Sequence, residues 1–239
     1  MTENTYIDPG ADTKEGYLIS STSRGLARMV VGNETPEDRI RQRCAISVGD
    51  FIMADLMAFN NNPVKAGLDA LASGAPIITD IRMVQTGIRK KEHNSEVLCV
   101  LDFGADISKE KEITRSSAGF LALKDRIEGS IVVIGNAPSA LLVVCNMIDE
   151  GIRPALVIGT PVGFVNAKES KEILRKKNVP SISNIGTRGG TPPAVASMND
   201  ALGSGHLGLS LLYGTHAFSP CQTLGSRMSP AFLSADNLR

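Results

Sequence analysis

A glycine-rich turn in the middle of the chain has residue types that could bind an anion. The turn "IGNAPSA" carries Gly135, Asn136 and Ala137 between an apolar segment and the start of an apolar helix. Backbone amides at a helix N-terminus favour an anion. The turn lacks the lysine of a P-loop and the G-x-G-x-x-G spacing, so it does not indicate a nucleotide phosphate. It either binds another anion or only redirects the chain.

Two further turns with a similar mixture of glycine and polar residues follow other apolar segments. They are "IGTPVGFVNAKES", which contains Gly163, and "NIGTRGGTPP", which contains Arg188 and Gly189. Glycine lets backbone approach a ligand closely, and arginine pairs well with carboxylates. A ligand contact and a purely structural turn both remain open for Arg188.

Short apolar segments alternate with segments of helical periodicity. Apolar strands separated by helices of ten or more residues indicate a mainly parallel sheet covered on both faces. We therefore predict a single α/β domain with Val132, Val133 and Ile134 buried in a central strand. Ligands of such sheets bind beyond the carboxyl ends of the strands, where the strand order reverses. The predicted strands are 75–79, 96–101, 130–135, 155–159 and 180–185.

The helices are predicted from capping residues and from apolar spacing. Thr35 can cap a helix, followed by a proline suited to the first turn, and we expect this helix to end near Phe59 before "NNNP". In the helix after "GNAP", the three- and four-residue spacing directs Leu141, Leu142 and Cys145 toward the sheet. The other predicted helices are 65–73, 116–127, 167–178 and 193–203.

The composition argues against several kinds of partner. The chain has 239 residues, 42% of them hydrophobic, and its 25 basic residues balance 25 acidic ones. A neutral chain without tryptophan is not an expected nucleic-acid binder. No apolar run approaches the ~20 residues of a membrane helix, and the polar start is no signal peptide. Four dispersed cysteines favour reduced thiols over disulfides or a metal site, so we expect a cytoplasmic protein.

Five blocks of the sequence resemble precorrin-8X methylmutase, the precorrin isomerase of cobalamin biosynthesis. They are "GAPIITDIRMVQTGI", "TRSSAGF", "GSIVVIGNAPSAL", "GTPVGFVNAKESK" and "TRGG", in the family's order. The resemblance covers about residues 17–202 and implies a parallel-sheet α/β fold, in a homodimer with the site near the subunit interface. We assign residues 1–202 to this domain and 203–239 to a C-terminal extension whose function is not readable.

The resemblance implies an isomerase that moves a methyl group between adjacent ring carbons of a corrinoid precursor. The product is hydrogenobyrinate or its cobalt analogue. Because this sigmatropic shift needs neither redox change nor group donor, no cofactor is expected. The tetrapyrrole precorrin-8X carries acetate and propionate carboxylates, which arginines and helix N-termini bind well. The anion expected at the "GNAPSA" turn is therefore a substrate carboxylate.

Site residues follow from the family's motifs. Arg115 matches the family's active-site arginine, and Ser20 falls where the family carries a serine near its N-terminus. Asp80 could simply cap the segment after it. The substrate-binding residues that the resemblance implies are Ser20, Thr79, Arg82, Thr114, Ser116, Gly135, Asn136, Ala137, Gly163, Arg188 and Gly189.

The sequence departs from the family at one important position. The family carries a histidine in the first long helix, credited with proton donation or hydrogen bonding to the ring. Alignment on Gly49 and Asp50 places Ile46 there, and isoleucine cannot act as a general acid. The three histidines, at positions 93, 206 and 216, lie elsewhere.

Two hypotheses follow from this departure. One is an isomerase with an altered acid or none, because positioning alone can accelerate an intramolecular shift. The other is a corrinoid-precursor binding protein that has lost catalysis.

Overall fold

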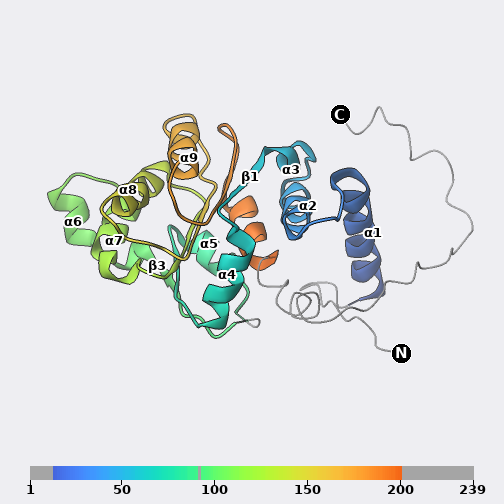
Figure 1. The fold of residues 1–239 in the computed structure, drawn as a ribbon, viewed down its shortest axis with the longest axis horizontal. Helices are drawn as coiled ribbons and strands as arrows, with labels where there is room; N and C mark the ends of the chain where they lie inside the picture. Colours follow the sequence, from blue (N-terminus) through green and yellow to red (C-terminus); the bar gives the residue numbers. More distant parts are fainter. Residues whose placement is uncertain (1–12, 91–92, 201–239) are drawn as a thin grey trace, which may run out of the picture.

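A six-stranded sheet forms the centre of the structure, a computed structural model that describes residues 13–90 and 93–200 (Figure 1). The strand order is β1-β6-β5-β4-β2-β3, and only the pair β1–β6 is antiparallel. The prediction of a mainly parallel α/β sheet is confirmed. The strands are β1 (Met57–Asn60), β2 (Ile77–Thr79), β3 (Val97–Cys99), β4 (Ile131–Ile134), β5 (Leu156–Gly159) and β6 (Ser181–Asn184).

Helices cover both faces of the sheet. Residues of α2, α4, α5 and the helical segment 191–200 form one apolar core layer with the strands, and α7, α8 and α9 form the other. The helices are α1 (Lys14–Val31), α2 (Pro36–Val48), α3 (Ile52–Leu56), α4 (Pro63–Ala72), α5 (Arg82–Gly87), α6 (Ala105–Glu110), α7 (Arg115–Ala122), α8 (Pro138–Asp149) and α9 (Ala167–Arg175).

The central strand β4 is buried on both faces, as expected. Val132, Val133 and Ile134 are each 0% exposed. Leu141 and Cys145 of α8 also lie in the core, but Leu142 is only half-buried. Val144 is buried in its place, so α8 presents 141, 144 and 145 to the sheet, a spacing of three and four residues.

The predicted first helix is wrong at its C-terminal end. Helix α2 starts after a capping box at Thr35 but ends at Val48, because Gly49 adopts a left-handed conformation with φ of 67°. After the short α3, the chain enters β1, which pairs with β6 across more than a hundred residues of sequence. The predicted helix 116–127 also ends early, at Ala122.

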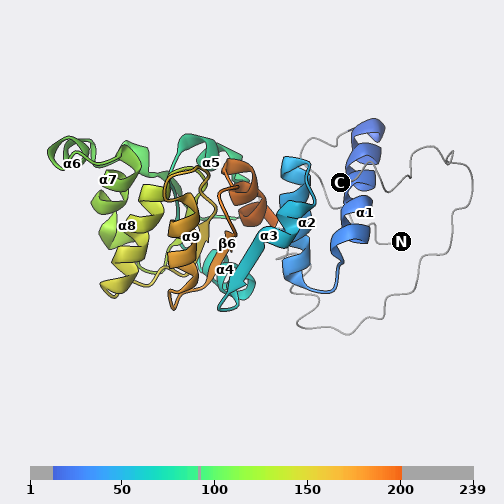
Figure 2. The ribbon, with the colours of Figure 1, turned by 90° about the horizontal axis from the view of Figure 1, so that it is seen from above.

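Helix α1, which the sequence did not predict, lies at one end of the molecule. It packs on α2, and Figures 1 and 2 both place it at the end opposite α6 and α7. Ala27 is the residue of α1 that is fully buried. The predicted extension 203–239, with its two histidines, lies outside the described residues. Within those residues no helix is both long and apolar enough to cross a membrane.

The strand order reverses between β2 and β4. From β2 the chain adds β3 on one side and then crosses to β4, β5 and β6 on the other. The crevice at the carboxyl ends of β2 and β4 is therefore the expected ligand position for this topology.

Candidate functional site

A buried carboxylate occupies the switch point. Asp80 follows β2 and is 0% exposed, and its two oxygens accept hydrogen bonds from the backbone amides of Gly135 (3.2 Å), Asn136 (2.8 Å) and Ala137 (2.9 Å). Burial raises the pKa of Asp80 above its ordinary value, and the three amides act in the opposite direction. The glycine-rich turn does hold an anion, but that anion is the protein's own carboxylate.

This arrangement corrects the expectation that the turn's amides bind a substrate carboxylate. All three amides already donate to Asp80. Asp80 therefore holds the turn that leads into α8, more than fifty residues further along the chain, and not the segment that follows it. Asn136 is exposed, so its side chain is the part of this turn that faces solvent.

The N-termini of α7 and α8 meet beside Asp80. Thr114 caps α7, and its hydroxyl oxygen lies 2.9 Å from that of Ser139 in α8. The buried Ser116 donates to the backbone carbonyl of Asp80 at 3.2 Å. Arg115, between Thr114 and Ser116, is exposed, and its side chain has no hydrogen bond or ion pair with any other described residue. Its guanidinium is thus open to a ligand at this edge.

Two other predicted contacts after β2 differ in accessibility. Thr79 is fully buried, and its hydroxyl donates to the carbonyl of Leu98 at 2.9 Å, so its side chain does not reach the surface of the site. Arg82 opens α5 and is exposed; it pairs with Asp102 and donates to Gln85 at 2.9 Å. Arg82 is therefore accessible at the carboxyl edge of the sheet, whereas the Thr79 side chain links β2 to β3.

The two remaining glycine-rich loops are joined to each other. Gly190 donates to the carbonyl of Thr160 at 2.7 Å, and Gly163 donates to the carbonyl of Thr187 at 3.2 Å. Gly189 has a φ of 153°, and a Cβ on it would lie 2.3 Å from the Thr160 oxygen. Glycine at 189 is therefore required by this close backbone approach, whether or not a ligand also contacts it.

A buried lysine anchors the second of these loops. Lys171 of α9 is 0% exposed and donates to the carbonyl of Arg188 at 2.6 Å and to the side chain of Asn184 at 3.2 Å. Asn184 also donates to the Arg188 carbonyl at 2.6 Å. Burial lowers the pKa of Lys171 to about 8, and the nearby Arg175 acts in the same direction. The backbone carbonyl of Arg188 is thus held by two buried side chains.

The side chain of Arg188 reaches toward α2. Its guanidinium lies 2.6 Å from a carboxylate oxygen of Asp50, and both side chains are partly exposed. Asp50 follows the turn that ends α2, so this ion pair joins the loop after β6 to the helix that carries Ile46. Arg188 already has a carboxylate partner, unlike Arg115.

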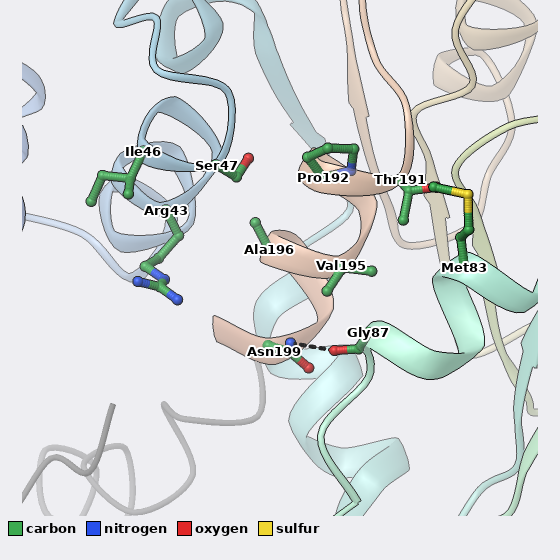
Figure 3. A pocket seen from close by; sticks show the side chains of 10 residues that line it. All are labelled: Arg43, Ile46, Ser47, Met83, Gly87, Thr191, Pro192, Val195, Ala196 and Asn199. Atoms are coloured by element: carbon green, nitrogen blue, oxygen red, sulfur yellow. Dashed lines mark hydrogen bonds between the residues drawn. The ribbon is translucent and has the colours of Figure 1, made fainter. Parts of the chain in front are cut away.

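A pocket of about 320 Å³ lies between α2, α5 and the helical segment 191–200, and Ile46 forms part of its wall (Figure 3). Arg43 extends from the same helix, one turn before Ile46. The pocket is lined by Arg43, Ile46, Ser47, Met83, Gly87, Thr191, Pro192, Val195, Ala196 and Asn199. It contains no histidine among the described residues.

An apolar fringe borders the carboxyl edge of the sheet. We use this name for five exposed side chains in the segments that follow β2, β5 and β6. Phe164 is 96% exposed, which is unusual for an aromatic residue outside an interface or a binding site. Together with the arginines, these groups suit a large ligand with an apolar body and an acidic rim. The fringe consists of Met83, Val162, Phe164, Val165 and Ile185.

The structure brings most of the predicted residues to one edge but not all of them. Arg82, Arg115, Gly163 and Arg188 belong to loops or helix starts at the carboxyl ends of the strands. Ser20 does not: it lies on α1, at the other end of the molecule from α7, and its hydroxyl accepts from Arg24 at 2.9 Å. No group of three or more metal-binding side chains occurs in 13–90 or 93–200.

Sequence reasoning missed the structural roles of Asp80 and Lys171. The partners of Asp80 lie more than fifty residues away, and nothing local indicates that pairing. Lys171 could have been found, because it falls on the buried face of α9 with Ala167 and Leu174 at four- and three-residue spacing. A lysine on an apolar helix face predicts a buried polar partner.

Comparison with known proteins finds relatives that are all described as precorrin-8X or cobalt-precorrin-8 methylmutases. A family model described as precorrin-8X methylmutase matches residues 19–203. The chain is 41% identical over 203 residues to a cobalt-precorrin-8 methylmutase of Methanocaldococcus jannaschii, covering 80% of this chain and 94% of that protein. A precorrin-8X methylmutase of Pseudomonas aeruginosa is 38% identical over 201 residues, covering 81% and 96%. The solved precorrin-8X methyl mutase from Thermus thermophilus matches with a TM-score of 0.73 at 32% identity, covering 80% and 97%.

The position of Asp80 leads to a test of stability. We expect Asp80→Asn to lower the free energy of unfolding by about 2 to 4 kcal/mol, because an amide group would face donors that now meet a carboxylate. Urea denaturation measures this change. Asp102→Asn, which affects only an exposed ion pair, should change stability little. Equal stability of Asp80→Asn and the unmodified protein would show that the three amides do not depend on the carboxylate.

Proposed function

The chain belongs to the precorrin-8X methylmutase family and is an isomerase of cobalamin biosynthesis, and we propose that it binds precorrin-8X or cobalt-precorrin-8 across the carboxyl edge of its sheet. The observation that carries this placement is the combination of an unpaired arginine, Arg115, with the apolar fringe at the same edge. A corrinoid precursor has an apolar ring face and a rim of carboxylates. Both parts of that ligand find matching groups there.

The reaction moves one methyl group within one molecule. The bond between the methyl carbon and its ring carbon breaks as a bond to the adjacent ring carbon forms, so no atom or electron enters or leaves. The task of the protein is then to hold the ring in the geometry of the shift. Fixing a reactive geometry supplies a large part of the acceleration in intramolecular reactions.

We assign distinct binding roles to the arginines of this edge. Arg115 pairs with a rim carboxylate, since no described residue neutralises it. Arg82 and Arg188 are each exposed beside an internal carboxylate, so their remaining donors are available for a second, weaker contact. Thr114 and Ser116 support Arg115 by fixing the first turn of α7.

Ile46 supports a second candidate function, a binding protein without turnover. Its side chain lines the pocket where the family carries its histidine, and it cannot donate a proton. We favour the isomerase because the shift is intramolecular and positioning alone can accelerate it. A protein that only binds would keep the same groups, so turnover must decide between the two.

We also propose that the protein works as a homodimer in the cytoplasm. Helix α1 exposes Leu18, Ile19, Leu26, Met29 and Val30 on an arc of about 120°, which is an unpartnered apolar stripe. Pairing of two copies through α1 would cover the stripe. The buried free thiols of the described residues suit a reducing compartment.

Turnover separates the isomerase from the binding protein. With precorrin-8X in about tenfold excess over protein, we expect the visible spectrum to change until all substrate has become product. Ile46→His should raise the rate, by about a hundredfold if it restores a general acid. A change that stops after one equivalent would establish binding without turnover, and no change at all would exclude both functions.

Arg115 is the strongest single test of the binding site. Arg115→Ala should raise the dissociation constant or KM for precorrin-8X by about tenfold or more, because a charge-assisted contact is lost. Titration of the visible spectrum measures the affinity. Arg126→Ala, which removes an arginine paired with Glu96 away from the site, should leave it unchanged. Identical binding by both variants would remove Arg115 from the site while leaving the fold intact.

The dimer is tested on α1. We expect sedimentation velocity to give the mass of two chains, and the double change Leu18→Glu, Met29→Glu to give one chain with reduced activity. Arg28→Glu, on the other side of the same helix, should stay dimeric. A monomeric unmodified protein with full activity would contradict the proposal.

A further inference from the structure

Arginines from three parts of the chain converge beside the pocket that contains Ile46. The carboxylate of Asp200, at the end of the helical segment 191–200, interacts electrostatically with Arg24 of α1, Arg39 and Arg43 of α2, and Arg89 after α5. Asp200 is 5% exposed, and burial raises its pKa while the arginines act in the opposite direction. We call these four arginines the arginine cluster.

Arg43 connects the arginine cluster to the pocket. It lines the pocket together with Ile46, which lies one helical turn further along α2 (Figure 3). Arg43 is half-buried, and no described residue forms a hydrogen bond or a close ion pair with it. A partly buried guanidinium in that situation attracts an anion.

The other polar groups of the pocket are largely engaged. Asn199 accepts from the backbone amide of Arg89 at 3.0 Å and donates to the carbonyl of Gly87 at 2.9 Å. Ser47 donates to the carbonyl of Cys44 at 2.8 Å. The charged group that this pocket offers to a ligand is therefore the guanidinium of Arg43.

We propose that Arg43, with the arginine cluster behind it, binds a side-chain carboxylate of the tetrapyrrole in the pocket beside Ile46. This proposal rests on the proposed function and adds a second carboxylate contact on the α2 side of the site, across the helical segment 191–200 from Arg115. Two anchored acids restrict rotation of the macrocycle in its plane far more than one. Because a guanidinium stays protonated near neutral pH, Arg43 binds and orients the substrate and is no proton donor.

The test compares one carboxylate ligand with its amide analogue. Hydrogenobyrinate and a derivative whose rim carboxylates are converted to amides are titrated into the unmodified protein, Arg43→Gln and Arg41→Gln. Arg41 is the matched control, because it lies on α2 but pairs with Asp38 and packs on Phe59. We expect Arg43→Gln to weaken binding of the acid about tenfold to a hundredfold and binding of the amide about twofold or less. Arg41→Gln should change neither.

Equal weakening of acid and amide by Arg43→Gln would overturn the proposal, since it would reveal a structural effect. Unchanged affinity for the acid would overturn it as well, while sustained turnover by the unmodified protein would keep the proposed function. Should Arg43→Gln fold poorly, Arg43→Lys is the second variant, because it keeps the charge without the planar fork. Its affinity for the acid should be lower than that of the unmodified protein and of Arg41→Gln, while its affinity for the amide should be unchanged. Failure of the unmodified protein to bind either ligand would count against the proposed function itself, and this subsite with it.

Discussion

The hydrogen bonds between the Asp80 carboxylate and the amides of the turn after β4 hold the site together. They join the end of β2 to the start of α8 across the point where the strand order reverses. Ser116 adds the start of α7 through the Asp80 carbonyl. The three amides of this turn are therefore used for the protein's own architecture. Arg82 lies two residues after Asp80, and Arg115 lies next to Ser116, so both arginines are close in the chain to residues of this network.

A second group of polar contacts fixes the opposite side of the site. Lys171 and Asn184 hold the backbone at Arg188, and Arg188 reaches Asp50 at the turn after α2. This chain of contacts links the loop after β6 to the end of α2, whose residues Arg43 and Ile46 form part of the pocket wall. Charged residues that sequence reasoning treats as ligand contacts thus also serve as structural links. A binding role for Arg188 is an addition to its ion pair and not a replacement for it.

The sequence was sufficient for the sheet but not for every element around it. Continuous apolar runs such as "SIVVIG" identify buried strands locally, because burial on both faces leaves no alternation. Strand β1 could not be found in this way, since "MAFN" becomes a strand only by pairing with the distant β6. Helix α1 has just one fully buried residue, so its sequence lacks the regularly spaced buried positions by which a core helix is recognised. At the site, the turn was identified as an anion site, but its anion came from a residue 55 positions earlier. Arg43 carries no local signal at all; only the packing of α2 against 191–200 reveals it.

The central claim is that this isomerase works by binding and orienting its substrate, without an ionisable group at position 46. Its most direct test is the dependence of kcat on pH between about 6 and about 7.5, the range in which a histidine acid would titrate. We expect kcat to stay constant within about twofold over this range, because arginines keep their charge throughout it. A fall in kcat with rising pH, with an apparent pKa near 6.5 that disappears when His93, His206 or His216 is replaced, would contradict the claim and identify the acid.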